Sequence, residues 1–589
     1  MKKRGKIGSY FSRLTGGSRI WSRLFPDTGI SARGKKSGVL KEDALLSGGM
    51  LGSLYSKISG YAAKARTFLA AFAEKSRVIS RLSAFCRWVL DTSVGSVGVF
   101  LFFVGLYSAA AFLIKLYADD AGDILDLVYS AVIAFIGLIL MPVRRSLLGC
   151  IRRGRLTSYI TEEMLAVSPF ALDTEVQAGK HIGWAVLFGT VAGIAGFFVS
   201  PLNIILFLLA LAGVAIVVYS PEGGLYVSVF LLPFASPWVS AAVALMAIVS
   251  YIYKLLIGKR NFYLTAADIF VFLFMISLSV AGLVTPFAYK ETIPVVLTVA
   301  ALYLLCANLM RSGKQLYRLM SALNSGTLIL ALCCIFSVLF GGELGALGAY
   351  ISSKSVYSFM IPILLPAALC TAFSRGVFSS GTACCIAVLA AVTLTFSEWM
   401  YLAVIGVTAL FLLVCFRKRI GIIFGALLSA GAVMVLFATG IIKGDMYIPS
   451  FGSSAAVDTM NKHGLYGVGL GEDAFNFAFR SAGYSGASDT DVYSALVIAG
   501  GWLAVTLFVI ATMFLLRRGL SSVSGKMQGV PKFSASAAVS FVCLLAICGV
   551  FGGIWRSPSI IMLFSVMCGA LSGLPRIYER EAGQANEIE

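Results

Sequence analysis

The chain has 589 residues, of which 59% are hydrophobic and 13% are charged, and its mean hydropathy is +0.90. Soluble domains carry about 25% charged residues, so this composition excludes a soluble globule. Apolar runs of about 18 to 22 residues recur from residue 96 onward, as membrane-spanning helices require. Outer-membrane barrels are excluded because their strands alternate over about ten residues. We therefore predict an all-α polytopic membrane protein.

The net charge of +19 is concentrated at the beginning of the chain. Residues 1–95 carry 18 Lys and Arg against 5 Asp and Glu, and we expect this region to be cytoplasmic. Within residues 51–89, apolar side chains recur at roughly helical intervals among basic ones, which is typical of a helix lying on an anionic lipid surface. Nucleic-acid binding is the competing use of such charge, but the aromatic platforms and motifs of nucleic-acid-binding proteins are missing.

After this region we predict about sixteen spans. Residues 96–150 form a two-helix membrane extension, 151–182 a cytoplasmic linker, 183–574 a core of fourteen helices, and 575–589 a cytoplasmic tail. The count is open at 183–257, where four prolines interrupt short apolar pieces, so that one span is re-entrant or two merge. The expected spans lie near residues 96–116, 124–143, 183–200, 202–220, 222–235, 239–257, 267–285, 293–310, 326–342, 356–374, 380–396, 399–415, 420–442, 490–516, 535–553 and 556–574.

The basic connections fix the expected orientation in the cell membrane. With a cytoplasmic N-terminus, every strongly basic connection falls on the inner side, as the positive-inside rule requires, and the C-terminus is also cytoplasmic. These connections include residues 144–155, 259–260, 311–318, 417–419 and 517–518. All twelve cysteines fall in apolar runs or on inner segments, so we expect no disulfide, and the adjacent pairs Cys333-Cys334 and Cys384-Cys385 favour packing over metal binding.

The same alternation places a long segment, residues 443–489, outside the cell, before the fourteenth of the sixteen expected helices. A long loop in a tightly connected chain is usually functional. This loop contains His463, one of only two histidines, together with Lys443, Lys462 and Arg480. Because external cations are scarce in this topology, those that remain, with Arg556, indicate an anion at the outer face, for which a lipid-linked phosphate is the obvious candidate.

The clearest motif lies in this loop, where residues 461–479 read NKHGLYGVGLGEDAFNFAF. Its glycines Gly467, Gly469 and Gly471 do not form a dinucleotide-binding loop, because no strand precedes them and the segment is external. Two interpretations stay open for this glycine block. The backbone amides approach a ligand closely, or the chain folds tightly onto the bundle.

The motif GLYGVGLG, followed by SDTDVYSALVIAGGWLA at residues 488–504, resembles the C-terminal half of the O-antigen ligase and O-antigen polymerase (Wzy-type) superfamily. The resemblance extends over residues 183–574 and includes PEGGLYVSVFLLPF at 221–234 and segments at 307–336, 356–373 and 394–413. The same C-terminal block is similar to the SEDS peptidoglycan polymerases, with Thr490-Asp491 opening a helix that ends in Arg517-Arg518. Residues 1–150 match no family in this way.

The resemblance implies a membrane glycosyltransferase of polysaccharide biosynthesis in the cell envelope. Glycan would pass from a polyprenyl diphosphate, such as undecaprenyl diphosphate, to an acceptor hydroxyl at the external face. In the SEDS family the aspartate at the position of Asp491 is catalytic, while Asp489 keeps the ligase-like spacing to Gly500. Asp491 is the first candidate for the base, Asp489 the second, and His463 a third. Lys462, Arg480, Arg556 and Lys443 are the candidates to bind the diphosphate.

The family works without a metal or another cofactor, and the expected partners are the polyprenyl-diphosphate-linked glycan and envelope-assembly proteins. Three alternatives remain: a polysaccharide or lipid-linked-sugar transporter or flippase, a SEDS-like peptidoglycan polymerase, and a non-catalytic scaffold. A transporter would predict inverted repeats and charges at mid-membrane depth, and the sequence contains no such repeat and few such charges.

Overall fold

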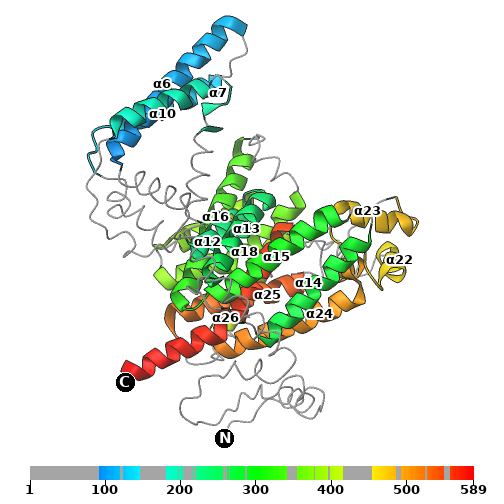
Figure 1. Ribbon diagram of the computed structural model, residues 1–589. Helices are drawn as coiled ribbons and strands as arrows, with labels where there is room; N and C mark the ends of the chain where they lie inside the picture. Colours follow the sequence, from blue (N-terminus) through cyan, green and yellow to red (C-terminus); the bar gives the residue numbers. More distant parts are fainter. Residues whose placement is uncertain are drawn as a thin grey trace. The chain divides into compact units, whose positions relative to one another are not determined.

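In the part of the chain that the structure, a computed structural model, describes, every regular element is a helix (Figure 1). The expected basic helix within residues 51–89, the span near 420–442 and most of the span near 202–220 lie outside the described residues. The described residues are 92–119, 124–145, 181–196, 198–201, 203–204, 217, 220–256, 262–263, 265–285, 288–340, 354–376, 378–395, 398–415, 454–485, 492–523, 527–548 and 558–588.

Eight helices of these ranges are long and apolar enough to cross a membrane. They are α6 (Val94–Asp119), α13 (Pro237–Leu256), α14 (Ala266–Val284), α15 (Tyr289–Leu309), α16 (Gly313–Phe340), α24 (Val492–Val523), α25 (Gly529–Cys548) and α26 (Pro558–Ile588). Shorter apolar stretches lie in α7 (Ile124–Leu140), α10 (Ile182–Ala195), α18 (Lys354–Arg375), α19 (Ser380–Thr395) and α20 (Glu398–Cys415). The chain is therefore an all-α, multi-pass membrane protein, and the expected count of about sixteen spans stays a prediction.

Several helix ends differ from the sequence-based expectation for local reasons. Helix α16 begins at Gly313 rather than near residue 326, because the Ser312 hydroxyl accepts the Gln315 amide at 3.3 Å and caps a basic first turn. Helix α12 (Pro221–Leu231) starts in the same way, with Ser220 as the cap and a proline in its first turn. Helix α26 continues to Ile588, through the residues expected to form a tail.

Helices α6, α7 and α10 pack on one another through small residues. A Cβ atom added at Gly98 or Gly105 of α6 would overlap the backbone of α7, and one added at Gly189 of α10 would overlap the backbone of α6. Such close approach of helices is typical of membrane interiors, where van der Waals packing rather than hydrophobic burial holds helices together.

The larger bundle is held by contacts between neighbouring helices, which are antiparallel for α14 and α24 and parallel for α15 and α26. Helices α14 and α24 stack their phenylalanines at two levels, Phe270 on Phe514 and Phe274 on Phe508, with ring centroids 5.5 Å apart in each pair. Helix α26 lies against α15, where the Ser565 hydroxyl donates to the Val299 carbonyl at 2.6 Å. These contacts place the end of α24, the start of α14 and the end of α26 at the same end of the bundle.

That end is rich in cations. The Arg576 guanidinium of α26 donates to the Ala307 carbonyl of α15 at 2.6 Å, and Arg375 lies over the Tyr317 ring at 5.6 Å. Asp268, a buried carboxylate at this end, accepts hydrogen bonds from Tyr303 and Ser572. We call this the basic end, and its described cations are Arg311, Lys314, Arg318, Arg375, Arg517, Arg518, Lys532, Arg576 and Arg580.

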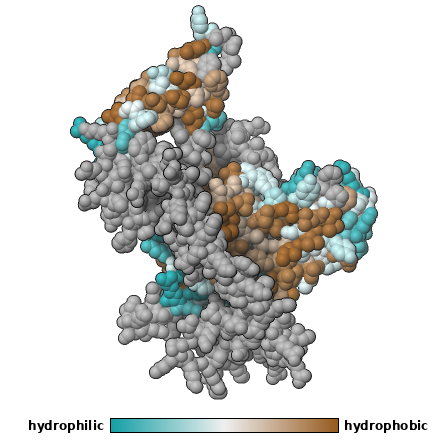
Figure 2. Space-filling model, in the orientation of Figure 1, coloured by the Kyte–Doolittle hydropathy of each residue, from teal (hydrophilic) through white to brown (hydrophobic). Residues whose placement is uncertain are grey.

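The opposite end carries two short helices, α22 (Ser454–His463) and α23 (Glu472–Ser481), in the segment expected to be a loop. The turn between them packs on the end of α14 and the start of α15, because Gly469 lies against Gly282 and Thr292. We call α22, this turn and α23 the hairpin. Figure 2 shows polar residues gathered at this end, beyond the apolar face that covers α14, α15 and α24.

Candidate functional site

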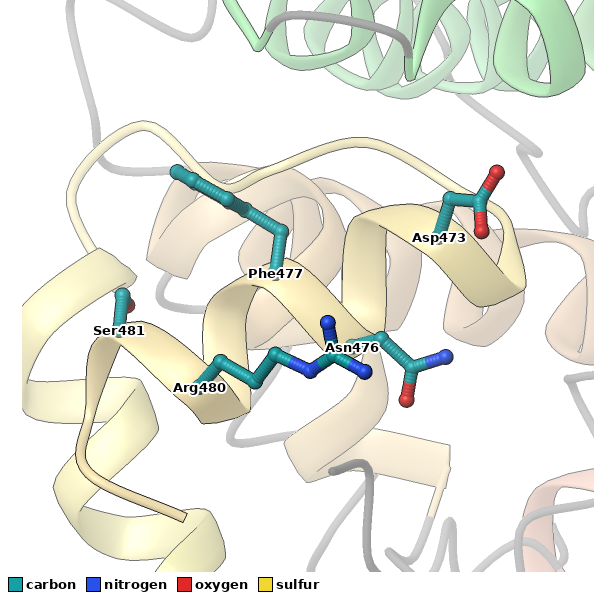
Figure 3. A pocket seen from close by; sticks show the side chains of 5 residues that line it. All are labelled: Asp473, Asn476, Phe477, Arg480 and Ser481. Atoms are coloured by element: carbon teal, nitrogen blue, oxygen red, sulfur yellow. The ribbon is translucent and has the colours of Figure 1, made fainter. Parts of the chain in front are cut away.

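Helix α23 is amphipathic and lies with its apolar side on the bundle. Ala474, Phe475, Ala478 and Phe479 recur at helical spacing and are buried. The other side lines a shallow groove of about 440 Å³, within the size range of small-ligand pockets. The described residues that line this α23 groove are Asp473, Asn476, Phe477, Arg480 and Ser481 (Figure 3).

The groove combines an aromatic ring with polar groups of both charges. Asp473, Phe477 and Ser481 follow one line along the helix, and Asn476 and Arg480 follow the neighbouring line. Figure 3 shows the Arg480 guanidinium reaching along the helix toward Asn476, while the Phe477 ring extends on the other side. Neither Asp473 nor Arg480 has a side-chain hydrogen bond or ion pair with another described residue, so both are available to a ligand.

At one end of the groove, the last residues of α22 contact the last residue of α23. The His463 Nε2 atom lies 2.6 Å from the Ser481 hydroxyl, and the Lys462 ammonium donates to the Ser481 carbonyl. The imidazole of His463 also lies beside the Phe477 ring, with centroids 6.2 Å apart. Partial burial, and then the positive charge of Lys462, lower the pKa of His463 below its ordinary value of 6.5.

The lowered pKa favours the neutral imidazole of His463, which has one nitrogen that can accept a proton. The Ser481 hydroxyl has a single proton and two acceptors within reach, the Ala478 carbonyl at 2.7 Å and His463 Nε2. When the hydroxyl donates to the Ala478 carbonyl, His463 Nε2 carries the hydrogen and donates to the hydroxyl oxygen. The lone pair of the imidazole is then on Nδ1. In the other arrangement, Nδ1 carries the hydrogen.

The glycine block holds the hairpin on a break in α24. Gly501 is non-helical, with φ 75° and ψ 176°, so the α24 hydrogen-bond ladder is interrupted there. The turn satisfies the freed groups: the Val468 and Gly469 amides donate to the Ile498 and Ala499 carbonyls, and the Trp502 amide donates to the Gly464 carbonyl, each at 2.8 Å. A broken helix in a membrane protein needs such compensation, because unpaired backbone groups are costly in the membrane.

The turn uses its own amides in this packing. The Gly467 amide donates to the His463 carbonyl, and the Leu470 amide donates to the Thr292 hydroxyl, both at 2.8 Å. Four consecutive amides, from residue 467 to 470, therefore donate to groups of the protein. Gly467, Gly469 and Gly471 all have positive φ, and a Cβ added at Gly471 would overlap the Glu291 carboxylate. Of the two interpretations of the glycine block, this geometry describes the tight fold onto the bundle.

The structure brings three of the sequence-predicted site residues, Lys462, His463 and Arg480, to one hairpin. Asp489 and Asp491 lie outside the described residues, although Asp491 immediately precedes α24, and so do Lys443 and Arg556. Sequence reasoning missed Asn476, Phe477 and Ser481. Their spacing with Asp473 and Arg480 on an amphipathic helix is the signal that could have found them.

No protein-family model, curated protein or solved structure matches this chain. The resemblance to O-antigen ligases and polymerases therefore stays a prediction. Within the described ranges, no group of three or more His, Cys, Asp or Glu side chains is arranged to hold a metal ion. The site offers an imidazole with a lowered pKa, a guanidinium that has no partner among the described residues, a second cation and a groove of ligand size.

Proposed function

We propose that this protein is a membrane glycosyltransferase that transfers or polymerises glycan from a polyprenyl diphosphate carrier at the external face of the cell membrane. The observation that carries the proposal is the placement of His463 and Lys462 side by side at one end of the α23 groove, at the end of the bundle opposite the basic end. A transfer reaction of this kind needs both a proton acceptor and a cation.

The distribution of charge supports an external hairpin. Basic residues cluster at cytoplasmic ends of spans, so the basic end is the expected inner side and the hairpin is the expected outer side. The hairpin end has few described cations, chiefly Lys290, Lys462 and Arg480, and carboxylates lie near them in the sequence. A lipid-linked diphosphate at the outer leaflet would meet Lys462 where the chain leaves the apolar bundle.

The chemistry requires two groups with separate tasks. The acceptor hydroxyl forms a new C–O bond with the anomeric carbon of the donor glycan, while the bond from that carbon to the diphosphate oxygen breaks. A base takes the hydroxyl proton, and cations stabilise the negative charge of the departing diphosphate. His463 is the described base, with Asp491 and Asp489 as the carboxylates that precede α24. Lys462 is the described cation beside the base, and Lys443 and Arg556 are its expected companions.

The test is glycan transfer by the purified full-length chain with polyprenyl-diphosphate-linked glycan, and surface glycan in cells that carry the same variants. We expect Asp491→Asn, Asp489→Asn or His463→Gln, tested singly, to identify the base by a loss of transfer of 10²-fold or more, the size of a general-base contribution. Lys290→Gln, at the same end but outside the hairpin, is the control. Wild-type transfer in all three variants would reject these residues as the base, absence of transfer by the unmodified chain would reject the enzyme, and accumulation of the lipid-linked donor on the inner leaflet would favour a flippase.

A further inference from the structure

The α23 groove offers a set of side chains that a diphosphate does not match. A diphosphate is strongly anionic, and Asp473, which lines the groove with Arg480, would repel it. Two opposite charges, each without a described partner, match an uncharged ligand that both donates and accepts hydrogen bonds. The Asn476 amide, which can also donate and accept, lies between Asp473 and Arg480 in sequence.

The groove also contains an apolar flat surface. The Phe477 side chain is 50% exposed, although it borders four polar residues, and its ring lies beside the imidazole of His463. The two buried phenylalanines of α23, Phe475 and Phe479, lie on its other side, so Phe477 is not part of the face that packs on the bundle. An exposed ring in a polar groove is suited to a ligand with one apolar face and hydroxyl groups around its edge.

A pyranose ring has this combination, because its axial C–H groups form an apolar face and its hydroxyls project from the edge. We propose that the α23 groove is a saccharide subsite, in which the Phe477 ring stacks on an uncharged sugar of the acceptor and Asp473, Asn476 and Arg480 bind its hydroxyls. This assignment rests on the proposed function and deepens it. Arg480 then binds sugar, and the diphosphate is left to Lys462 and the cations outside the groove.

The position of His463 gives the subsite a role in the reaction. The imidazole lies at the Ser481 end of the groove, 6.2 Å from the Phe477 ring by centroids. A sugar stacked on Phe477 therefore presents an edge hydroxyl toward the imidazole. The groove would select the acceptor and orient its hydroxyl for proton removal, so Phe477, Asn476 and Arg480 are binding residues of the acceptor.

Binding can be tested without any reaction. Saturation-transfer NMR on the full-length protein in detergent, with the methyl glycosides of glucose, galactose and N-acetylglucosamine as probes, should show contact with sugar ring protons for at least one of them. Phe477→Leu keeps an apolar side chain but removes the ring, and Asn476→Ala removes the amide. We expect each to weaken binding of that glycoside at least fivefold. Phe477→Tyr keeps the ring and should bind like the wild type.

Two controls make the result specific. Leu465→Ala changes a side chain that is 73% exposed on the same hairpin but outside the groove, and it should leave binding unchanged. Inorganic pyrophosphate serves as the anionic probe. Arg480→Gln should weaken binding of the glycoside and leave binding of pyrophosphate unchanged. The proposal is overturned when the wild type binds no glycoside at millimolar concentration, or when Phe477→Leu binds the glycoside like the wild type. It is also overturned when Arg480→Gln loses binding of pyrophosphate but keeps binding of the glycoside.

Failure of this subsite and failure of the proposed function are distinguishable. Glycoside binding by a wild-type protein that transfers no glycan would reject the transferase and keep the groove. Glycan transfer at the wild-type rate by Phe477→Leu and Asn476→Ala would reject the groove and keep the transferase. Melting temperatures of all variants, measured in the same detergent, show whether each protein is folded.

Discussion

At the scale of single residues, two effects act in the same direction on the His463 imidazole. Burial disfavours its charged form, and the Lys462 ammonium on the preceding residue repels a second positive charge. The folded-state pKa is therefore below the unfolded value of 6.5, and the unfolded chain binds the proton more readily. The stability that neutral His463 contributes is present above pH 6.5 and is lost as the pH falls through the folded-state pKa.

The Lys462 part of this effect can be measured directly. The chain has only two histidines, so a His181→Gln background leaves His463 as a single imidazole for NMR titration. We expect its pKa to be below 6.5 in this background and to rise in Lys462→Gln, without reaching 6.5, because the burial remains. Lys290→Gln, which removes an exposed cation at the same end, should not change the pKa. A pKa that does not respond to Lys462→Gln would contradict the charge effect.

At the scale of elements, the hairpin and the break in α24 form one unit. The glycine turn supplies donors and an acceptor to the backbone groups that Gly501 frees. The Thr292 hydroxyl accepts from the Leu470 amide at 2.8 Å and donates to the Leu470 carbonyl at 2.9 Å. Loss of close contact in the turn should therefore destabilise the whole hairpin, and not one bond alone.

Gly467→Ala tests this coupling, with Gly483→Ala as its matched control. Both glycines have positive φ, 74° and 98°, so alanine brings backbone strain to each. Only at Gly467 would the added Cβ overlap the Ala499 carbonyl of α24, whereas the space around Gly483 is open. We expect Gly467→Ala to lower the free energy of unfolding by about 1–3 kcal/mol more than the control, seen as a lower Tm in detergent. Equal losses would show that the turn and α24 are independent.

Some elements could be predicted from the sequence and others could not. Continuous apolar runs predicted α14, α15 and α20 to within a few residues, because a membrane span needs a fixed length of apolar chain. The hairpin was predicted as a loop, since α22 and α23 are short and bury one side only. The break at Gly501 was not predicted either, because it depends on the glycine turn, which is distant in the chain.

The candidate site was predictable only in part. The scarcity of cations on the expected outer side and a rare histidine pointed to Lys462, His463 and Arg480, which lie on α22 and α23 of the hairpin. Asn476, Phe477 and Ser481 are common residue types, so composition does not distinguish them. Their place in the groove follows from the orientation of α23, which is set by the burial of Phe475 and Phe479 on the bundle.

At the scale of the whole molecule, the two ends of the larger bundle differ in charge and in aromatic content. The basic end carries the arginines and lysines of α16, α24 and α26. The hairpin end exposes the rings of Tyr289, Tyr466 and Trp502. Exposed aromatic rings near the ends of spans are typical of the membrane–water interface, and a one-sided excess of cations is typical of the cytoplasmic side.

These patterns predict that the hairpin is accessible from outside the cell and the basic end from inside. Leu465→Cys on the hairpin and Lys314→Cys on α16 place thiols at exposed positions. On intact cells, a membrane-impermeant maleimide should label the first and not the second, and permeabilised cells should show both. The nine described cysteines are buried or half-buried, so the unmodified chain serves as the control for background labelling.

The reverse labelling pattern would put the α23 groove in the cytoplasm, where glycan carried to the outer leaflet could not reach it. The transferase proposal would then fail, whatever the groove binds. Labelling of both positions from one side would contradict the antiparallel packing itself, because α14 and α24 place the hairpin and the basic end at opposite ends of the same helices. The experiment therefore tests the orientation and the fold with one pair of variants.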